Sequence, residues 1–263
     1  IGYAVRGEQK RSSRTQVEVI TDGLFLRRLQ SDPSLDGVGC VIFDEFHERG
    51  RDADLALALL REARPLLNPD LALMLMSATL DLSDLRERLP EATVLESPGR
   101  CYPVETHHQP PRPDEPLPRQ VLRAIEQHAL DQPQGSGVLV FLPGLAEIER
   151  CRQILTAAPS LQNWKIQALH GQLPLQQQSS ALQRCDPHQD GSIILASAIA
   201  ESSLTIDGVR LVIDSGLSRQ LRYDPNTRME GLETTPSSLA SAEHRRGRAG
   251  RQCPGSCIRL WSP

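Results

Sequence analysis

Short runs of apolar residues recur along this chain, and segments of helical composition separate them. Residues 38–43 and 71–76 are continuous apolar runs, and residues 17–20 (VEVI) favour a further short strand. Residues 52–63 (DADLALALLREA) favour a helix with Asp52 as its N-cap. Strands that are apolar throughout and alternate with helices are typical of parallel sheets covered on both faces. The pattern therefore predicts an α/β protein.

The alternation resumes in the second half of the chain. Helices are predicted over residues 121–129 and 145–155. Strands are predicted over residues 137–142, 166–169, 192–196 and 209–213.

A proline-rich stretch separates the two halves. Six prolines crowd residues 103–118, and proline removes a backbone donor and disfavours helix at the preceding residue. We therefore predict a first unit over residues 1–105, a linker over residues 106–118 and a second unit over residues 119–263.

Composition excludes several classes of protein. The 263 residues are 39% hydrophobic, and the net charge is −4, which excludes a disordered chain and a histone-like polycation. No apolar run reaches the roughly 18–20 residues that span a bilayer, so no membrane partner is expected. The six cysteines form no C-x-x-C pair. They are expected to be reduced thiols in a cytoplasmic protein.

An acidic pair directly follows one apolar run, in residues 41–48 (VIFDEFHE). Ligands bind at the carboxyl ends of parallel strands, where Asp44 can hold Mg²⁺, mostly through its waters, while the ion bridges nucleotide phosphates. Glu45 can then polarise the attacking water, and His47 can act as a polar coupling group. The alternative is an ordinary strand followed by an acidic turn.

Residues 244–251 (HRRGRAGR) hold four arginines. Arg248 and Arg251 are three residues apart, so in a helix they share a face. Two guanidinium groups on one face suit a triphosphate, whose charge they neutralise in the transition state. The alternative is a basic surface patch that touches RNA or nothing.

Taken with four further blocks, these two segments resemble the DEAH-box branch of superfamily 2 helicases, most closely the bacterial HrpB type. The blocks follow the family's order and cover nearly the whole chain. They resemble motifs Ib to VI at residues 21–28 (TDGLFLRR), 44–47 (DEFH), 77–79 (SAT), 141–144 (FLPG), 200–209 (AESSLTIDGV) and 244–251.

The resemblance implies two RecA-like parallel-sheet lobes, the first incomplete, with ATP between them and single-stranded RNA across their tops. By motif position, Asp44 coordinates Mg²⁺ and Glu45 orients the hydrolytic water. His47, together with Ser77 and Thr79, links the nucleotide state to lobe movement.

The resemblance also implies roles for residues of the second half. Ser203 is similar to a nucleotide sensor and Asp207 to a ribose contact, while Arg248 and Arg251 are similar to arginine fingers. RNA-backbone contacts, which position a strand without reading its sequence, are implied at Thr21, Ser197 and Thr205. His170 follows a predicted strand, and it either contacts RNA or is a satisfied loop histidine.

Three departures from the family pattern stand out. His244 replaces the glutamine that begins motif VI; it can donate a hydrogen bond, but its charge depends on pH. Motif V begins with Ser197 and Ala198 in place of Thr-Asn. No G-x-x-x-x-G-K-[ST] sequence occurs, since the only lysines, Lys10 and Lys165, do not follow a glycine.

The missing P-loop leads to two hypotheses. The first is the core of an ATP-dependent RNA helicase, inactive as these 263 residues alone and lacking the family's C-terminal accessory domains. In that case residues 71–76 expose an unpaired apolar edge, because the family's P-loop strand lies beside them. The second is a non-catalytic single-stranded RNA-binding fragment or pseudoenzyme. A DNA translocase is a third, less favoured alternative.

Overall fold

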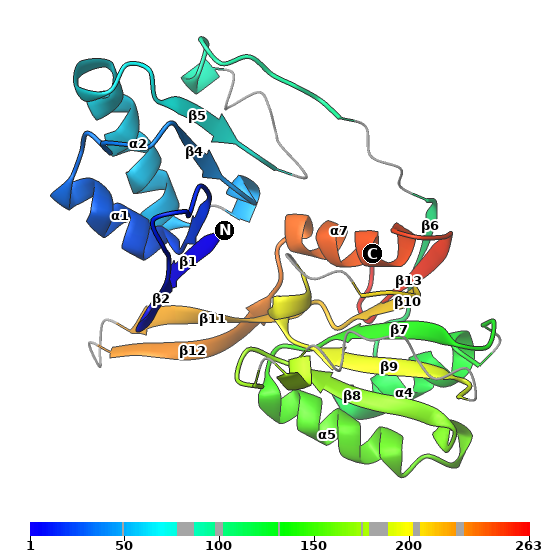
Figure 1. The fold of residues 1–263 in the computed structure, drawn as a ribbon. Coiled ribbons are helices and arrows are strands. Elements are labelled where there is room, and N and C mark those ends of the chain that lie inside the picture. Colours follow the sequence, from blue (N-terminus) through cyan, green and yellow to red (C-terminus); the bar gives the residue numbers. More distant parts are fainter. Residues whose placement is uncertain are drawn as a thin grey trace. The chain divides into compact units, whose positions relative to one another are not determined.

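The computed structural model describes residues 1–48, 50–77, 87–97, 102–130, 132–174, 176–178, 189–201, 206–224 and 229–263. The chain divides into two compact units, unit 1 (Ile1–Glu96) and unit 2 (Ser97–Pro263), which appear from blue to cyan and from green to red in Figure 1. In these described ranges, no helix is both long enough and apolar enough to cross a membrane.

In its described residues, unit 1 combines two small sheets with two helices. Strand β1 pairs antiparallel with β2 and parallel with β3, while β4 pairs parallel with β5. The elements are β1 (Gly2–Val5), β2 (Glu8–Lys10), β3 (Glu18–Ile20), α1 (Asp22–Ser31), β4 (Cys40–Phe43), a 3-10 turn (Phe46–Glu48), α2 (Arg51–Leu67) and β5 (Ala72–Leu75).

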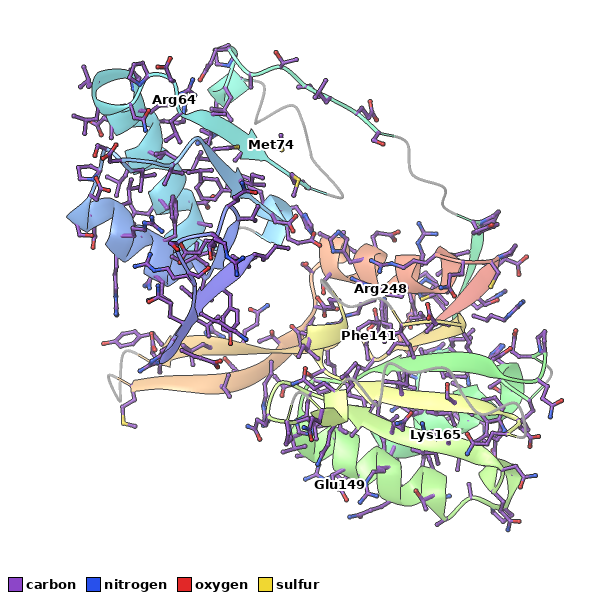
Figure 2. All side chains as sticks on the ribbon, viewed as in Figure 1. Arg64, Met74, Phe141, Glu149, Lys165 and Arg248 are labelled. Atoms are coloured by element: carbon purple, nitrogen blue, oxygen red, sulfur yellow. The ribbon has the colours of Figure 1, made fainter. Side chains whose placement is uncertain are left out.

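The helices of unit 1 cover one face of the β4–β5 pair. Val41 and Phe43 are buried with Leu60 of α2 and Leu29 of α1 in one apolar cluster. On the other face, Ile42 is 52% exposed and Met74 (labelled in Figure 2) is 46% exposed. The prediction that both faces are covered is therefore wrong for the described part of unit 1, because its helices supply one layer only. Within the same part, β5 pairs with β4 alone, which agrees with the predicted apolar edge.

Unit 2 is built on a six-stranded parallel sheet in the order β6-β13-β10-β7-β9-β8. Because every strand runs the same way, all six carboxyl ends lie at one edge. The elements are β6 (Val104–His108), α4 (Leu117–His128), β7 (Ser136–Phe141), α5 (Leu145–Thr156), β8 (Trp164–Leu169), β9 (Gly191–Ala196), β10 (Val209–Asp214), β11 (Leu217–Asp224), β12 (Met229–Pro236), α7 (Leu239–Gly247) and β13 (Gly255–Arg259), with 3-10 turns at Pro159–Leu161, Ala198–Ala200 and Arg248–Gly250.

Different elements cover the two faces of this sheet. Val138 and Val140 point into a cluster with α4 and α5. Leu139 and Phe141, the alternate residues of β7, point to the opposite face, where Ala249 and the segment after β9 pack. Figure 1 shows α4 and α5 on one side of the sheet and α7 on the other. The predicted α/β class is therefore seen most fully in unit 2.

The segment predicted as a linker is partly a strand and partly attached to a helix. Residues 106–108 belong to β6, which pairs parallel with β13, and the division between the units falls after Glu96 instead of after residue 105. Farther along, Arg123 of α4 donates to both carboxylate oxygens of Glu115, at 2.9 and 2.8 Å, and to the Pro110 carbonyl at 3.2 Å. The sequence could not show this, because the bidentate pair forms only once α4 is folded.

The Glu115–Arg123 pair gives a pH-dependent prediction. The hydrogen bond from Arg123 lowers the pKa of Glu115 below its ordinary value of 4.5. Its stabilising contribution is therefore present above that value and lost as the pH falls through the lowered folded-state pKa. We expect Glu115→Gln to reduce the free energy of unfolding of unit 2 by about 1 kcal/mol at pH 7.

Denaturant unfolding of wild type and variant at pH 7 and pH 3 measures this difference. Glu230→Gln, which removes an exposed carboxylate of β12, is the matched control. A deficit of the same size at both pH values would show that the charge of Glu115 does not matter.

Candidate functional site

The acidic turn of unit 1 has a strained backbone at Glu45. This residue follows the carboxyl end of β4 and has φ +49°, in the left-handed region that residues with a side chain rarely adopt. Such strain persists where the surroundings enforce it. The Glu45 backbone N–H donates to Asp44 Oδ1 at 2.9 Å, and the Phe46 N–H donates to the Met76 carbonyl at 3.0 Å. The turn therefore fixes the backbone at both predicted acids, Asp44 and Glu45.

Phe46 anchors this turn in the core of unit 1. Its ring is 6% exposed and meets Phe43 edge to face, with the ring centroids 6.1 Å apart. Phe43 meets Phe25 of α1 in the same way at 5.8 Å. The third residue of the DEFH block is thus a packing residue, and its burial holds the acids at the surface beside it.

His47 brings the predicted coupling residues together. Its Nδ1 lies 3.1 Å from Ser77 Oγ, and its Nε2 lies 3.5 Å from Glu45 Oε2. The imidazole is 8% exposed, so its orientation is set by packing. One tautomer satisfies both contacts, with the Ser77 hydroxyl donating to Nδ1 and the Nε2–H facing the carboxylate. Thr79, the other predicted coupling residue, lies outside the described residues.

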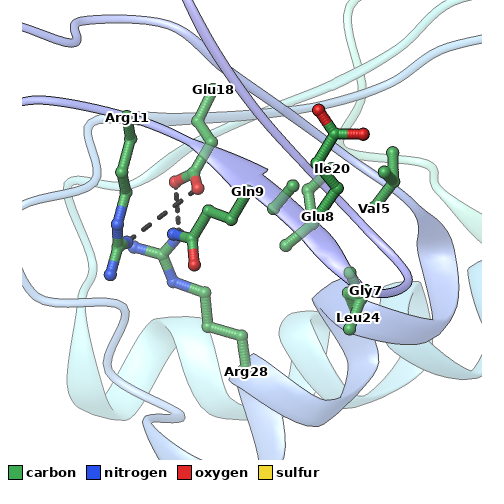
Figure 3. A pocket seen from close by; sticks show the side chains of 10 residues that line it. Val5, Gly7, Glu8, Gln9, Arg11, Glu18, Ile20, Leu24 and Arg28 are labelled. Carbon is green, nitrogen blue, oxygen red and sulfur yellow. Dashed lines mark hydrogen bonds and ion pairs between the residues drawn. The ribbon is translucent and has the colours of Figure 1, made fainter.

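The acids line a cavity of about 160 Å³ at the end of β4. Besides Asp44 and Glu45, its lining includes Asp22 from the first turn of α1, which the sequence reasoning did not single out. A larger cavity of about 450 Å³ lies against β1, β3 and α1 (Figure 3). There the Glu18 carboxylate lies 2.8 Å from Arg28 and 3.9 Å from Arg11, so one acid pairs with two guanidinium groups.

The donor set around Asp44 fits a magnesium ion that is shared with phosphates. Among the side chains that the structure describes, no three His, Cys, Asp or Glu groups come together as a complete metal site. Mg²⁺ does not need one, because it commonly takes one or two carboxylates and completes its octahedron with water and phosphate oxygens. Asp44, at a strand end beside the cavity, suits that arrangement.

In unit 2 a buried guanidinium connects three segments. Arg245 of α7 is 1% exposed. It donates to Glu201, after β9, at 2.6 Å and to Asp214, at the end of β10, at 2.7 Å. Its guanidinium also lies over the Phe141 ring, 5.2 Å from the centroid. Burial raises the pKa of Asp214, and the charge of Arg245 opposes that rise.

The two predicted arginine fingers differ in burial. Helix α7 ends at Gly247, and Arg248 begins a 3-10 turn. Arg251 directly follows this turn, three residues after Arg248. Arg248 (labelled in Figure 2) is nevertheless 8% exposed and donates to the Glu201 carbonyl, whereas Arg251 is exposed. His244 is half-buried in the last turn of α7.

Asp207 lies beside the arginine segment. It precedes β10, and its carboxylate accepts a hydrogen bond from Gln252, the residue that follows Arg251. The structure thus brings the predicted ribose contact and the arginine segment together within unit 2. The predicted nucleotide sensor Ser203 and the predicted RNA contact Thr205 lie outside the described residues.

The other predicted RNA contacts fall in both units. Thr21 is exposed and precedes α1, where its carbonyl accepts from the Leu24 and Phe25 N–H groups. Ser197 follows β9 at the carboxyl edge of the large sheet, and its N–H donates to the Leu169 carbonyl. His170 therefore lies next to Ser197, and its buried Nδ1 finds no partner among the described residues.

Comparison with known proteins identifies the family. The family described as helicase conserved C-terminal domain matches residues 120–253. The chain belongs to this helicase family. Its predicted resemblance to DEAH-box RNA helicases of the HrpB type, and the α/β fold with a RecA-like second lobe, are confirmed by the relatives.

The similar helicases are longer proteins. The ATP-dependent RNA helicase HrpB of Escherichia coli (strain K12) is 42% identical over 260 residues, covering 99% of this chain and 32% of that protein. The mouse protein named probable ATP-dependent RNA helicase DHX34 is 39% identical over 274 residues, covering 100% of this chain and 24% of that protein. The chain therefore spans about a quarter to a third of the length of these relatives.

Solved helicase structures agree with this assignment. A crystal structure of the E. coli DExH-box NTPase HrpB matches with a TM-score of 0.87 and 41% identity, over 99% of this chain and 32% of that one. A structure of the E. coli DEAH/RHA helicase HrpB matches with a TM-score of 0.90 and 40% identity, over 99% of this chain and 33% of that one.

Sequence reasoning missed several residues of this helicase site. Glu201 and Arg245 lie inside recognised blocks, and their signal was a charge close to residues that pack against the sheet, Ala200 and Ala249. Asp214 ends an apolar strand, as Asp44 does, and that shared position was available as a signal. Gln252 carried no signal, because its role depends on contact with a turn 44 residues away.

Loss of the buried arginine is predicted to destabilise the helicase C-terminal domain. Arg245→Met leaves Glu201 and Asp214 without their cation, and breaking a buried ion pair in this way costs about 3–5 kcal/mol. Without the guanidinium the pKa of Asp214 rises further, so the carboxyl gains a proton in the folded state. The stabilisation that this proton contributes is complete below the ordinary pKa of 3.8. It is lost as the pH rises through the higher pKa of the folded state.

Denaturant unfolding at pH 7.5 and pH 5, as chosen experimental conditions, is expected to give a smaller deficit at the lower pH. Asp214→Asn in the Arg245→Met background is expected to restore part of the loss. The control is Arg222→Met, because Arg222 is 71% exposed in its pair with Glu233. Equal losses in Arg245→Met and Arg222→Met would refute the role of the buried network.

Proposed function

We propose that this chain is the core of an ATP-dependent RNA helicase of the DEAH-box, HrpB type, which couples ATP hydrolysis to movement along or unwinding of nucleic acid. The observation that carries the proposal is the strained acidic turn, in which the Glu45 carboxylate contacts His47 and His47 in turn contacts Ser77. The names of the relatives support the same function.

In unit 1, Asp44 would hold Mg²⁺ together with the phosphates of ATP. Such an ion neutralises phosphate charge and favours in-line attack by water. Glu45 orients the attacking water and accepts its proton at a carboxylate oxygen. A change at Glu45 then reaches His47, which contacts its carboxylate, and passes from His47 to Ser77.

In unit 2, the arginine segment neutralises the charge that develops on the transferred phosphoryl group. Arg248 and Arg251 supply the guanidinium groups, and His244 supplies a hydrogen bond. Asp207 contacts the ribose, and Ser203 senses the nucleotide. Because Arg248 donates to the Glu201 carbonyl, a change at the phosphates is transmitted to the segment after β9.

Single-stranded RNA is proposed to run along the phosphate contacts Thr21, Ser197 and Thr205. Such contacts hold the backbone without reading sequence, so binding weakens as salt rises. DNA remains the less favoured strand, and comparison of RNA and DNA tests the contribution of the 2′-OH. A cytoplasmic location is part of the same proposal.

The second candidate is a non-catalytic RNA-binding fragment or pseudoenzyme. The absence of a P-loop sequence from these 263 residues favours it. A P-loop cradles phosphates with backbone N–H groups and a lysine, so we propose that the 263-residue chain alone turns over little ATP. The longest natural reading frame that contains it is the protein to assay.

Glu45→Gln separates the two candidates. In that longest natural protein we expect RNA-stimulated ATP hydrolysis, and the variant should reduce turnover by at least ~100-fold, because a well-placed general base contributes about 10²–10⁴-fold. ATP binding should persist, since the amide keeps the size of the side chain. Turnover is measured by phosphate release, and binding by fluorescent-nucleotide titration.

Glu62→Gln, a change on α2 outside the acidic turn, controls for loss of charge in unit 1. Stimulation by RNA over DNA of the same sequence would support the RNA assignment. Unchanged hydrolysis in Glu45→Gln would remove Glu45 from its role. Absence of hydrolysis in the wild type, with RNA binding retained, would favour the second candidate.

A further inference from the structure

The side-chain amide of Gln252 makes two hydrogen bonds to one turn. Its Nε2 donates to Asp207 Oδ1 at 2.6 Å, and its Oε1 accepts from the Gly208 backbone N–H at 2.9 Å. One planar group therefore holds a carboxylate and the adjacent peptide at the same time.

The turn itself is anchored in the large sheet. Gly208 has φ +77°, a conformation that favours glycine, and its carbonyl accepts from the Gly137 N–H of β7 at 2.8 Å. The backbone directly after Asp207 is therefore fixed by β10 and β7. The exposed Asp207 side chain could still rotate on this fixed backbone, and its hydrogen bond with Gln252 restrains that rotation.

The contact requires both a donor and an acceptor on the residue at position 252. A glutamine amide has both. Glutamate keeps the acceptor for Gly208 but turns a carboxylate toward Asp207, and leucine loses both bonds. Gln252 donates its hydrogen bond to Oδ1 of Asp207, so the second carboxylate oxygen, Oδ2, takes no part in this contact.

We propose that Gln252 is a positioning residue that orients Asp207 toward the ribose of the bound nucleotide. The inference rests on the proposed function, in which Asp207 makes the ribose contact. Gln252 directly follows Arg251, so the same residue keeps the ribose-contacting turn beside the arginine segment. Gln252 thereby contributes to discrimination between ribonucleotides and deoxynucleotides, although it touches neither.

The test is Gln252→Glu in the longest natural protein that contains this chain. KM and kcat are measured for ATP, 2′-deoxy-ATP and 3′-deoxy-ATP. The analogue that lacks the contacted hydroxyl is the one for which the wild-type protein has a higher KM than for ATP. We expect the KM for ATP to rise about tenfold, the value of one charge-assisted hydrogen bond. The KM for that analogue should change little, so the preference for ATP collapses. A purely structural role would raise all three KM values together.

Three further variants sharpen the result. Gln162→Glu adds the same charge at an exposed position after the Pro159–Leu161 turn and should leave the preference unchanged. Gln252→Leu should reproduce the loss of preference without adding charge. In an Asp207→Asn background, Gln252→Glu should have no additional effect on the preference.

The outcomes separate this inference from the function beneath it. Absence of ATP turnover in the wild type would overturn the proposed function and the inference with it. Turnover with an unchanged ribose preference in both Gln252 variants would overturn the inference alone. Faster hydrogen exchange at the Gly208 amide in Gln252→Leu, measured by mass spectrometry, would show directly that the amide contact exists in solution.

Discussion

The arrangement of the candidate site in unit 2 depends on one buried positive charge, that of Arg245. A guanidinium that is 1% exposed is stable only if carboxylates and carbonyls surround it, because an unpaired buried charge costs several kcal/mol, roughly 3–5. Arg245 obtains Glu201 from the segment after β9 and Asp214 from the end of β10. The Leu217 carbonyl, at the base of the β11–β12 ribbon, is a further acceptor at 3.2 Å. The hydrogen bonds of Arg245 therefore fix the relative positions of α7, the segment after β9, the end of β10 and the ribbon.

The placement of the other arginines follows from this arrangement. Because Glu201 is held by Arg245, its carbonyl is in position to accept from Arg248. The 3-10 turn that starts at Arg248 then carries Arg251 and Gln252 to the Asp207 turn. Unit 1 positions its charged groups differently, through a left-handed backbone at Glu45 and the buried ring of Phe46.

Sequence reasoning predicted the elements whose cause is local. Residues 137–142 form an apolar run, and residues 192–196 and 209–213 are apolar apart from Ser192 and Arg210. These segments lie within or beside β7, β9 and β10 of the parallel sheet. The ribbon β11–β12 was missed because its residues are largely polar and exposed, which gives no apolar run to detect. Strand β6 was missed because it lies in the proline-rich stretch.

The candidate site shows the same division. The position of Asp44 and Glu45 at the carboxyl end of a parallel strand, where ligands commonly bind, could be predicted. The left-handed conformation of Glu45 could not, since no glycine or asparagine marks it and the Phe46 contacts that impose it are tertiary. Arg245 and Gln252 act through partners far away in the sequence, so their roles become visible only when those partners are brought together.

The central proposal is that the acidic turn of unit 1 and the arginine segment of unit 2 both act in the hydrolysis of ATP. Distances between spin labels, introduced as unnatural amino acids at Arg51 and Leu239, test it in the longest natural protein that contains this chain. Both positions are highly exposed, Arg51 with 91% of its side chain and Leu239 with 85% of its surface. The account predicts that Mg²⁺ with a non-hydrolysable ATP analogue shortens and narrows the distance distribution, and that Arg251→Ala abolishes the change. A distribution that stays the same while the nucleotide is bound would contradict it.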